Sequence, residues 1–473
     1  HTDRQQTTFA TARYSNVPHG NSGAGGTVSL GSAASPALGS VTTHGDDAPA
    51  LFGQSIGGGG GWATMGCTNS PAQHSTHLAS ACWGNTQTTG GGQPAPFIGA
   101  AGTEGVAINL NGGNDTAQAI SAGSGAVTIY SKQHITTYGA RSMGMIAQGI
   151  TGGGGFFSGV NRRIHSVTMP TQQRVTNLSP ASVSVTLSSS KISTYGDGAW
   201  GVLAQMIQGG GGFFGDPTQD LAFNTKTSQS ANPTPNAFVA SRKTGPSGSF
   251  LHAVDPSKLP TKSTADTWTN HPLAVALSDT TIRTRGTNAH GVVTQNLGTV
   301  GGIWSSADGP LHVGVSLEGV NTLGNTAGGQ VNMTLKNSQI TVTGQNARGV
   351  IIQSDGAGPG GAGDHGKITV NIAQGSTISS AQHTALMLVG GSFDATSRNQ
   401  IVIDASVITT GRFHPALSDS DDGDNNWAIY APTGYTDVIN QKTGRIEGNI
   451  LLGIRTKGDF FNHGTFSGTT FSG

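Results

Sequence analysis

One stretch of the sequence contains cysteine and histidine residues. Their side chains could bind a metal ion, and the cysteines could instead form a disulfide. Cys67 and Cys82 are the only cysteines, and they bracket His74 and His77. Thiolate and imidazole are zinc ligands, but this spacing matches none of the usual zinc-finger patterns. We therefore favour a disulfide between Cys67 and Cys82, which implies an oxidising compartment, and keep zinc as the alternative.

A second group consists of acidic side chains. The stretch DSDDGD, Asp419 to Asp424, contains four carboxylates, at Asp419, Asp421, Asp422 and Asp424. Hard oxygen ligands at this density suit calcium, although the spacing is not that of an EF-hand loop. The sequence thus predicts an exposed acidic loop, with calcium as the one cofactor that it suggests.

Two further motifs approach those of enzymes and then depart from them. GNSGAGG, from Gly20, resembles the Gly-Asp-Ser-Gly of trypsin-like proteases with Asn in place of Asp, and its candidate partner His44 occupies a position that we expect to face solvent. GAGDHGKI, Gly361 to Ile368, approaches a P-loop, but Ile368 replaces the hydroxyl residue and a strand is expected to follow. We therefore expect a protein without catalytic activity.

Composition indicates the class of protein that carries these residues. Glycine accounts for 75 of 473 residues, only 10% are charged, and basic and acidic residues number 24 each. This balance creates no field that would attract nucleic acid. No apolar run approaches the roughly 18 residues of a membrane span. Because the sequence begins at His1 without a leader, we expect a processed segment that does not insert into a membrane.

An internal repeat organises the chain. Each copy opens with a β-branched residue, has glycine four positions later and ends with glutamine thirteen positions after its start. Weaker copies are expected from Ile378 and Ile408. The five clear copies begin at Val41, Ile135, Ile192, Ile282 and Ile340 and end at Gln54, Gln148, Gln205, Gln295 and Gln353.

Alternating segments such as SVSVTL and LAVAL precede most copies, and period-two alternation is typical of strands that bury one face. Each unit therefore predicts three short strands that form one coil, and stacked coils form an all-β, elongated β-solenoid. The copies start 94, 57, 90 and 58 residues apart, from which we expect about two coils in every 57 or 58 residues.

Glycine runs follow the glutamines, from Gly57, Gly152 and Gly209. Glycine suits corners where φ is positive or where stacked backbones approach closely, so we expect Gly-rich corner loops. The alternative is a row of exposed aromatic loops that forms an adhesive stripe. The large side chains that follow the runs are Trp62, Phe156, Phe157, Phe213, Phe214, Ile303 and Trp304.

The motif G-x-x-A-x-G-V-x-x-Q-x-I-x-G-G-G-G, clearest at Gly196 to Gly212 and at Gly45 to Gly61, resembles the glycine-rich repeats of Gram-negative autotransporter passenger domains. The resemblance covers most of Val41 to Ala431. It implies a secreted β-helical rod at the bacterial cell surface, used for adhesion or aggregation. The outer-membrane barrel that follows such passengers is not part of this sequence.

We expect an N-terminal extension with a first coil at 1–40, a solenoid at 41–435 with the disulfide-bearing loop at 62–95, and an assembly segment of short coils at 436–473. Phe466 and Phe471, in the repeated TFSG, are candidates for self-association. The predicted function is non-catalytic, extracellular, structural or adhesive, with head-to-tail contacts between copies and with cell-surface or matrix glycans as further partners. The alternative is a carbohydrate-active β-helix enzyme or a passenger protease.

Overall fold

The described part of the chain consists of β-strands and the turns between them. It contains no helix with the length and hydrophobicity needed to cross a membrane. The structure is a computed structural model, and it describes residues 25–57, 60–66, 98–100, 106–109, 123–151, 154–160, 164–169, 182–207, 211–215, 217–225, 237–239, 272–298, 301–305, 311–315, 328–355, 366–392, 394–410, 427–432, 434–453 and 458–472.

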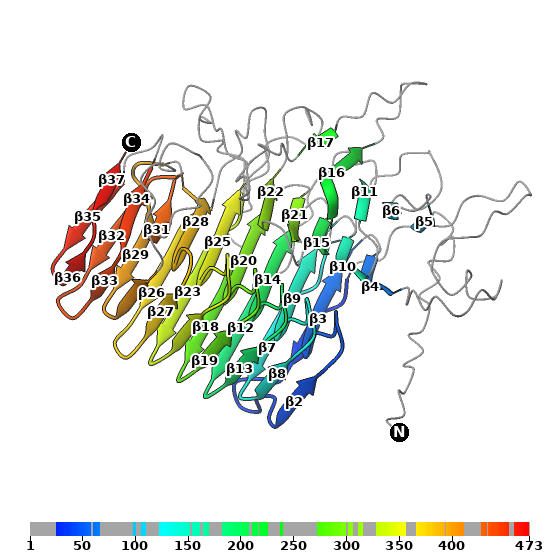
Figure 1. Cartoon of the computed structure of the whole chain (residues 1–473), viewed down its shortest axis with the longest axis horizontal. Coiled ribbons are helices and arrows are strands. Elements are labelled where there is room, and N and C mark those ends of the chain that lie inside the picture. Colours follow the sequence, from blue (N-terminus) through cyan, green and yellow to red (C-terminus); the bar gives the residue numbers. More distant parts are fainter. Residues whose placement is uncertain are drawn as a thin grey trace, which may run out of the picture.

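Three parallel sheets of nine strands each run along an elongated rod (Figure 1). Sheet A contains β1 (Val28–Leu30), β7 (Val127–Ser131), β12 (Val183–Ser188), β18 (Leu273–Ser278), β23 (Val331–Lys336), β26 (Ile368–Ile372), β29 (Asn399–Ile403), β32 (Thr436–Asn440) and β35 (Asp459–Asn462). Sheet B contains β2 (Ser40–Thr43), β8 (His134–Thr137), β13 (Lys191–Thr194), β19 (Thr281–Thr284), β24 (Gln339–Val342), β27 (Thr377–Ser380), β30 (Ser406–Thr409), β33 (Arg445–Glu447) and β36 (Thr465–Ser467). Sheet C contains β3 (Leu51–Ile56), β9 (Met145–Ile150), β14 (Val202–Ile207), β20 (Val292–Leu297), β25 (Val350–Asp355), β28 (Leu386–Gly390), β31 (Trp427–Ala431), β34 (Asn449–Leu452) and β37 (Thr470–Ser472).

One strand from each sheet forms a coil, and we number the coils 1 to 9 from β1–β2–β3 to β35–β36–β37. Equivalent residues of the repeat lie opposite one another: Ile192 pairs with Ile135 and with Ile282, and Gln205 pairs with Gln148 and with Gln295. The prediction of an all-β solenoid of three-strand coils is confirmed.

Alternation along the strands explains how the rod is filled. In β12, Val183, Val185 and Leu187 are buried while the residues between them are partly exposed, and the inward residues of all three sheets form one continuous apolar core. Sheet C differs, because β9, β14 and β20 are buried at every position. A strand buried on both faces needs a second layer outside it.

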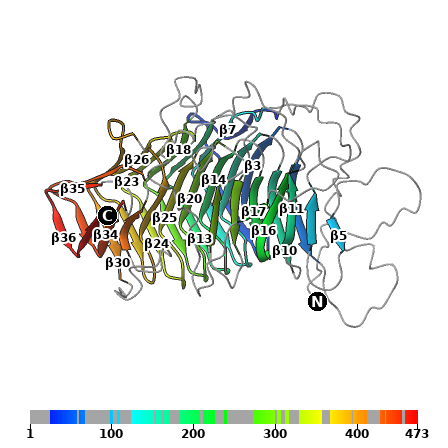
Figure 2. The same ribbon diagram turned by 90° about the horizontal axis from the view of Figure 1, so that it is seen from above.

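Two further sheets lie outside the three long ones, along the N-terminal half of the rod (Figures 1 and 2). Sheet D contains β4 (Gly60–Gly66), β10 (Gly154–Val160), β15 (Gly211–Gly215), β21 (Gly301–Ser305) and β22 (Leu311–Val315). In sheet D, the aligned strands β4, β10 and β15 begin within the glycine runs, so that Gly155 pairs with Gly61 and with Gly212. Sheet E contains β5 (Ile98–Ala100), β6 (Val106–Asn109), β11 (Ile164–Met169), β16 (Pro217–Thr225) and β17 (Ala237–Val239).

This second layer corrects the expected number of coils. Clear repeat copies lie on adjacent coils, because β13 pairs directly with β8 and with β19. An interval of 57 or 58 residues therefore holds one coil, and the expectation of two was wrong. Among the described residues, those beyond the coil in these intervals form strands of sheets D and E, where we had expected a second coil.

The register also corrects the last weak copy. Ile378 pairs with Val407, not with Ile408, and Val407 is fully buried while Ile408 is partly exposed. Both residues are β-branched, so the repeat pattern alone did not distinguish them. A shift of one residue reverses which side chain faces the core.

Candidate functional site

An exposed column of aromatic and cationic side chains crosses the first four coils, and we call it the aromatic column. It consists of His44, Tyr138, Tyr195 and Arg285, each directly after the last residue of a sheet B strand. Tyr138 N–H donates to the Thr43 carbonyl at 3.0 Å, and Tyr195 N–H donates to the Thr137 carbonyl at 2.9 Å. The parallel register therefore places these side chains one above another.

The rings of the aromatic column are nearly parallel. Ring centroids lie 4.9 Å apart between His44 and Tyr138, and 5.0 Å apart between Tyr138 and Tyr195, with interplanar angles of 5° and 15°. The guanidinium carbon of Arg285 lies 4.8 Å from the Tyr195 centroid, as in a cation–π contact. Tyr138 is 47% exposed and Tyr195 is 37% exposed. Two accessible phenols are thus held face to face.

Glycine after each member makes this close stacking possible. A Cβ added at Gly139 would overlap the carbonyl oxygen of Gly45, and one added at Gly196 would overlap that of Gly139. The turn backbones therefore approach each other as closely as the strands do. We expected His44 and its equivalents to face solvent, which the exposed tyrosines confirm. The sequence repeat carries the information for this stack, because the same repeat position recurs in each of these successive coils.

The turn beside the aromatic column has a left-handed residue in each of the first five coils. Asparagine, aspartate and glycine adopt this conformation readily, whereas arginine rarely does. The φ angles are 52°, 53°, 64°, 54° and 55° at Asp47, Arg141, Gly198, Asn288 and Asn346.

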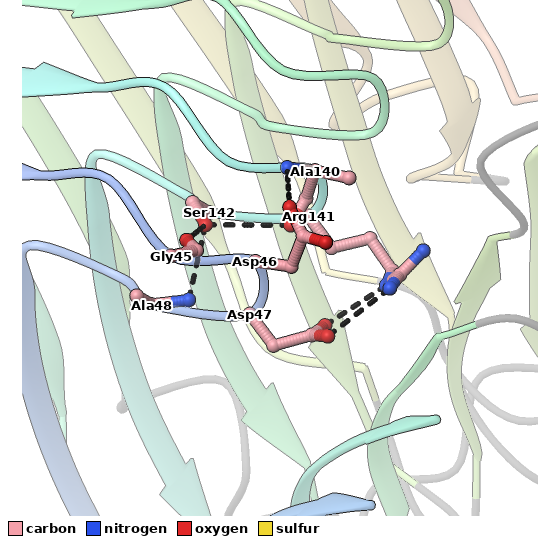
Figure 3. A network of polar contacts seen from close by, with 7 residues as sticks. All are labelled: Gly45, Asp46, Asp47, Ala48, Ala140, Arg141 and Ser142. Atoms are coloured by element: carbon pink, nitrogen blue, oxygen red, sulfur yellow. Dashed lines mark hydrogen bonds and ion pairs between the residues drawn. The ribbon is translucent and has the colours of Figure 1, made fainter. Parts of the chain in front are cut away.

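Asp47 and Arg141 form a buried ion pair between the turns of coils 1 and 2 (Figure 3). Arg141 Nε donates to Asp47 Oδ1 at 2.9 Å and Nη2 donates to Oδ2 at 3.1 Å. Both residues are almost completely buried, at 6% and 2% exposure. A bidentate pair of this kind satisfies a buried charge that would otherwise be costly, and here it fixes the two left-handed residues.

Hydroxyl and carboxylate contacts join the same two turns (Figure 3). Ser142 Oγ donates to the Gly45 carbonyl at 2.6 Å and accepts from Ala48 N–H at 3.0 Å. Asp46 Oδ1 accepts from Ala140 N–H at 2.8 Å. These side chains bind backbone groups of the neighbouring coil, so their role is to hold the turns in register.

The repeat glutamines form a buried ladder along the rod. In each of the first four repeat glutamines, the side-chain Nε2 donates a hydrogen bond to Oε1 of the glutamine in the next coil. The distances are 2.8 Å from Gln54 to Gln148, 2.6 Å from Gln148 to Gln205, 2.8 Å from Gln205 to Gln295 and 2.6 Å from Gln295 to Gln353.

The glutamine ladder also contacts the backbone of the glycines that begin the strands of sheet D. Gln295 Nε2 also donates to the Gly302 carbonyl at 3.1 Å, and Gln205 Nε2 lies 3.4 Å from the Gly212 carbonyl. Gly212 has a φ of 138°, and a Cβ there would overlap the Gly155 carbonyl oxygen. Positive φ and close backbone contact therefore both require glycine at Gly212, the second residue of β15, whereas Gly209 and Gly210, at the expected corner, lie outside the described residues.

The aromatic residues after the glycines form a second core between sheets C and D. Phe156 and Phe213 are fully buried, and their rings stack with centroids 4.7 Å apart. Trp200 packs edge-on against Phe213 at 5.1 Å. The described aromatics at this position thus cover sheet C, and the alternative of an exposed stripe is wrong for Phe156, Phe213 and the equally buried Ile303. For Trp62, Phe157, Phe214 and Trp304 the structure describes the strand but not the side chain.

A buried polar cluster joins coils 4 to 6. The Arg348 Nη2 lies 3.3 Å from Nε2 of His383, and Arg348 N–H donates to Nδ1 of His290 at 3.0 Å. Burial lowers the pKa of both imidazoles well below the usual range, and the Arg348 guanidinium lowers each pKa further. Both histidines are therefore neutral near pH 7 and act as packing and hydrogen-bonding groups.

Two carboxylates converge on sheet A near the C-terminal end, and we did not single them out from the sequence. Asp437 and Asp459 lie opposite each other on β32 and β35. Arg398 binds both, at 2.9 Å and 2.7 Å. Partial burial raises the pKa of Asp437, and the Arg398 charge opposes that rise.

Several predicted site residues lie outside the described residues. These are Cys67 and Cys82 with His74 and His77, the acidic residues Asp419, Asp421, Asp422 and Asp424, and Ser22 of the protease-like motif. Within the described ranges, no group of three or more metal-binding side chains occurs. The P-loop-like stretch leads into β26 at Ile368, which confirms that a strand follows it.

The C-terminal phenylalanines lie in coil 9. Phe466 is partly buried against the central core, and Phe471 packs on the second core with its ring 5.3 Å from that of Trp427. Phe460 contacts Phe466 edge-on at 5.0 Å. Both predicted residues therefore pack on their own rod, at the last strand of their sheets within the described residues.

Comparison with known proteins does not assign the chain to a family. No family model, no curated protein and no solved structure matches the chain.

Proposed function

We propose that this chain is a non-catalytic, extracellular rod with a structural or adhesive function at a Gram-negative cell surface. The observation that carries the proposal is the continuous stack of nine coils whose interior is filled with side chains. Short polar residues such as Thr128, Ser184 and Thr186 lie on the outer side of sheet A. A long repetitive surface of this kind suits contacts with cell-surface or matrix glycans.

End-to-end association of copies is the second part of the proposal. The last described strands of sheets A, B and C are β35, β36 and β37. Ile450 N–H donates to the Thr469 carbonyl at 2.9 Å, so the next residue, Thr470, directs its backbone groups away from coil 8. Such an edge is a template for a further parallel strand. Coil 1 of a second copy has the matching order of strands, and a contact of this type builds filaments.

Sedimentation of the full chain over a range of concentrations tests this association, with electron microscopy of the same samples. We expect polymers whose length grows with concentration, and Thr470→Pro should reduce them to monomers because proline removes an outward N–H. Thr470→Val is the matched control, since it keeps that N–H. A full-length chain that stays monomeric at high concentration would refute end-to-end association.

A carbohydrate-active enzyme is the second candidate, and the Asp437–Asp459 pair is the observation that favours it. Paired carboxylates can act as acid and base on a glycosidic bond. Here both are bound by Arg398, which suits a structural ion pair better. Incubation with a panel of polysaccharides tests this: release of sugars by the chain, abolished in Asp437→Asn, would support catalysis and overturn the non-catalytic proposal.

A further inference from the structure

We propose that Tyr138 and Tyr195 form an oxidative cross-linking site, at which a one-electron oxidant such as a peroxidase with hydrogen peroxide joins the two phenols as dityrosine. The inference rests on the aromatic column alone and is independent of the proposed function.

Geometry favours this pair. Parallel strands hold Thr137 and Thr194 in register, and the tyrosines that follow them stack with centroids 5.0 Å apart and planes 15° apart. Because the two rings stack, the ortho carbons of each phenol lie on a ring that faces the other. Because the fold holds the rings together, coupling between them is intramolecular and has a high effective concentration.

Accessibility is the second requirement. At 47% and 37% exposure, both phenols can lose a proton to water while the oxidant removes an electron. His44 and Arg285 cover the outer faces of the two rings. Within the described column, each tyrosine radical therefore has the other tyrosine as its facing phenol.

The chemistry balances as follows. Each phenol loses one proton and one electron, which gives two neutral phenoxyl radicals. The radicals couple to form one carbon–carbon bond between ortho carbons, and the ortho hydrogens then move to the oxygens to restore both phenols. The protein loses two hydrogens in total, and hydrogen peroxide accepts the two electrons and two protons and becomes two molecules of water.

The other described tyrosines, Tyr130, Tyr430 and Tyr435, lack this arrangement, and the ring of Tyr435 has the Arg398 guanidinium carbon 5.9 Å from its centroid. Tyr130 is partly exposed on sheet A, and its register partner on β12 is Thr186. Tyr430 is buried and pairs with Met387 and Leu451. Tyr130 is thus a matched control: it lies on the same coil as Tyr138 and has no tyrosine opposite it in these pairings.

The test treats dilute full-length protein with peroxidase and hydrogen peroxide, and it measures dityrosine fluorescence and the masses of proteolytic peptides. We expect a linked peptide pair that contains Tyr138 and Tyr195 and is lighter by two hydrogens than the sum of its parts. Y138F and Y195F should each reduce the signal to background, whereas Y130F should retain it. Circular dichroism checks that each variant is folded.

Two results would overturn the proposal. One is the absence of the linked peptide pair from oxidised, folded wild-type protein. The other is dityrosine that persists in Y138F or Y195F, or that joins two molecules, because the stacked pair would then not be the site. A linked product should also resist thermal unfolding better than untreated protein, since the bond closes a loop between coils 2 and 3.

Discussion

Gln148 donates a side-chain hydrogen bond to Gln205 at 2.6 Å, in a part of the rod where both residues are fully buried. Replacing Gln205 with leucine would leave Gln148, Gln295 and the Gly212 carbonyl without this partner. Each unsatisfied buried group costs about 1–3 kcal/mol. We expect the opening free energy of coil 3, measured by amide hydrogen exchange, to fall by about 3 kcal/mol or more.

Gln54→Leu is the control, because Gln54 is at the partly exposed end of the ladder, where water can replace a lost partner. We expect a clearly smaller loss there. Equal losses in both variants would mean that the ladder contributes no more in its buried centre than at its end.

Gly212→Ala should destabilise the contact between β15 and β10 in sheet D. The residue has a φ of 138°, and the new methyl would overlap the Gly155 carbonyl oxygen. We expect a loss of about 3 kcal/mol or more in the same exchange measurement, within the range of severe core substitutions. Gly26→Ala is the control, since a Cβ there meets nothing within 4 Å. Similar protection in the two variants would contradict this account of the glycines.

Asp47→Asn should weaken the contact between coils 1 and 2, because it leaves Arg141 buried beside a neutral amide. Removing one partner of a buried ion pair costs about 3–5 kcal/mol. The double variant Asp47→Asn, Arg141→Asn should recover most of this loss, because asparagine occupies the same left-handed position at Asn288 and Asn346. Limited proteolysis of the N-terminal coils measures this stability. We expect slow cleavage of the wild type and of the double variant, and fast cleavage of the single variant. Faster cleavage of the double variant than of the single variant would contradict this prediction, because the Arg141 substitution would then add to the loss of stability.

Acid should destabilise coils 4 to 6 through His290 and His383. Their pKa values are lower in the folded chain than the usual 6.5, so the unfolded chain binds more protons between the two values. The free energy of unfolding is therefore fully retained above about pH 6.5 and falls as the pH drops, by about 1.4 kcal/mol per pH unit for each histidine.

Hydrogen exchange at several pH values, corrected for the intrinsic rate, gives this slope. His290→Met places at this position the residue found in coil 2, Met143, and should remove about half of the slope. An unchanged slope in that variant would exclude His290 as the titrating group.

The repeat predicted the three-strand coil and the stacking of equivalent positions, but not the number of coils, because identical positions in parallel strands must stack. Ile135, Ile192, Ile282 and Ile340 are all buried in one column, as the β-branched start of each copy indicated. The glutamines aligned for the same reason. What these amides contact was not predictable, since a glutamine that ends a strand can equally well face water.

The second layer was not predictable from the pattern. In the sequence, Phe156 and Phe213 follow glycines and are followed within a few residues by polar ones, which suits an exposed stripe as well as a strand. Only the outer face of sheet C, apolar at Ile146 and Leu203, requires a cover. The Asp437–Asp459 pair was missed because its two acids lie on short coils that carry no copy of the glycine–glutamine repeat.

The direction of the backbone hydrogen bonds gives the rod a mechanical character. They run from coil to coil along its length, so a pull between the two ends acts in line with them (Figure 1). Because each coil is held mainly by its two neighbours, it can be detached singly. Coils 1 to 5 share the glutamine ladder, whereas coils 6 to 9 stack without it. Under tension coils 6 to 9 should therefore unreel first, while coils 1 to 5 stay stacked.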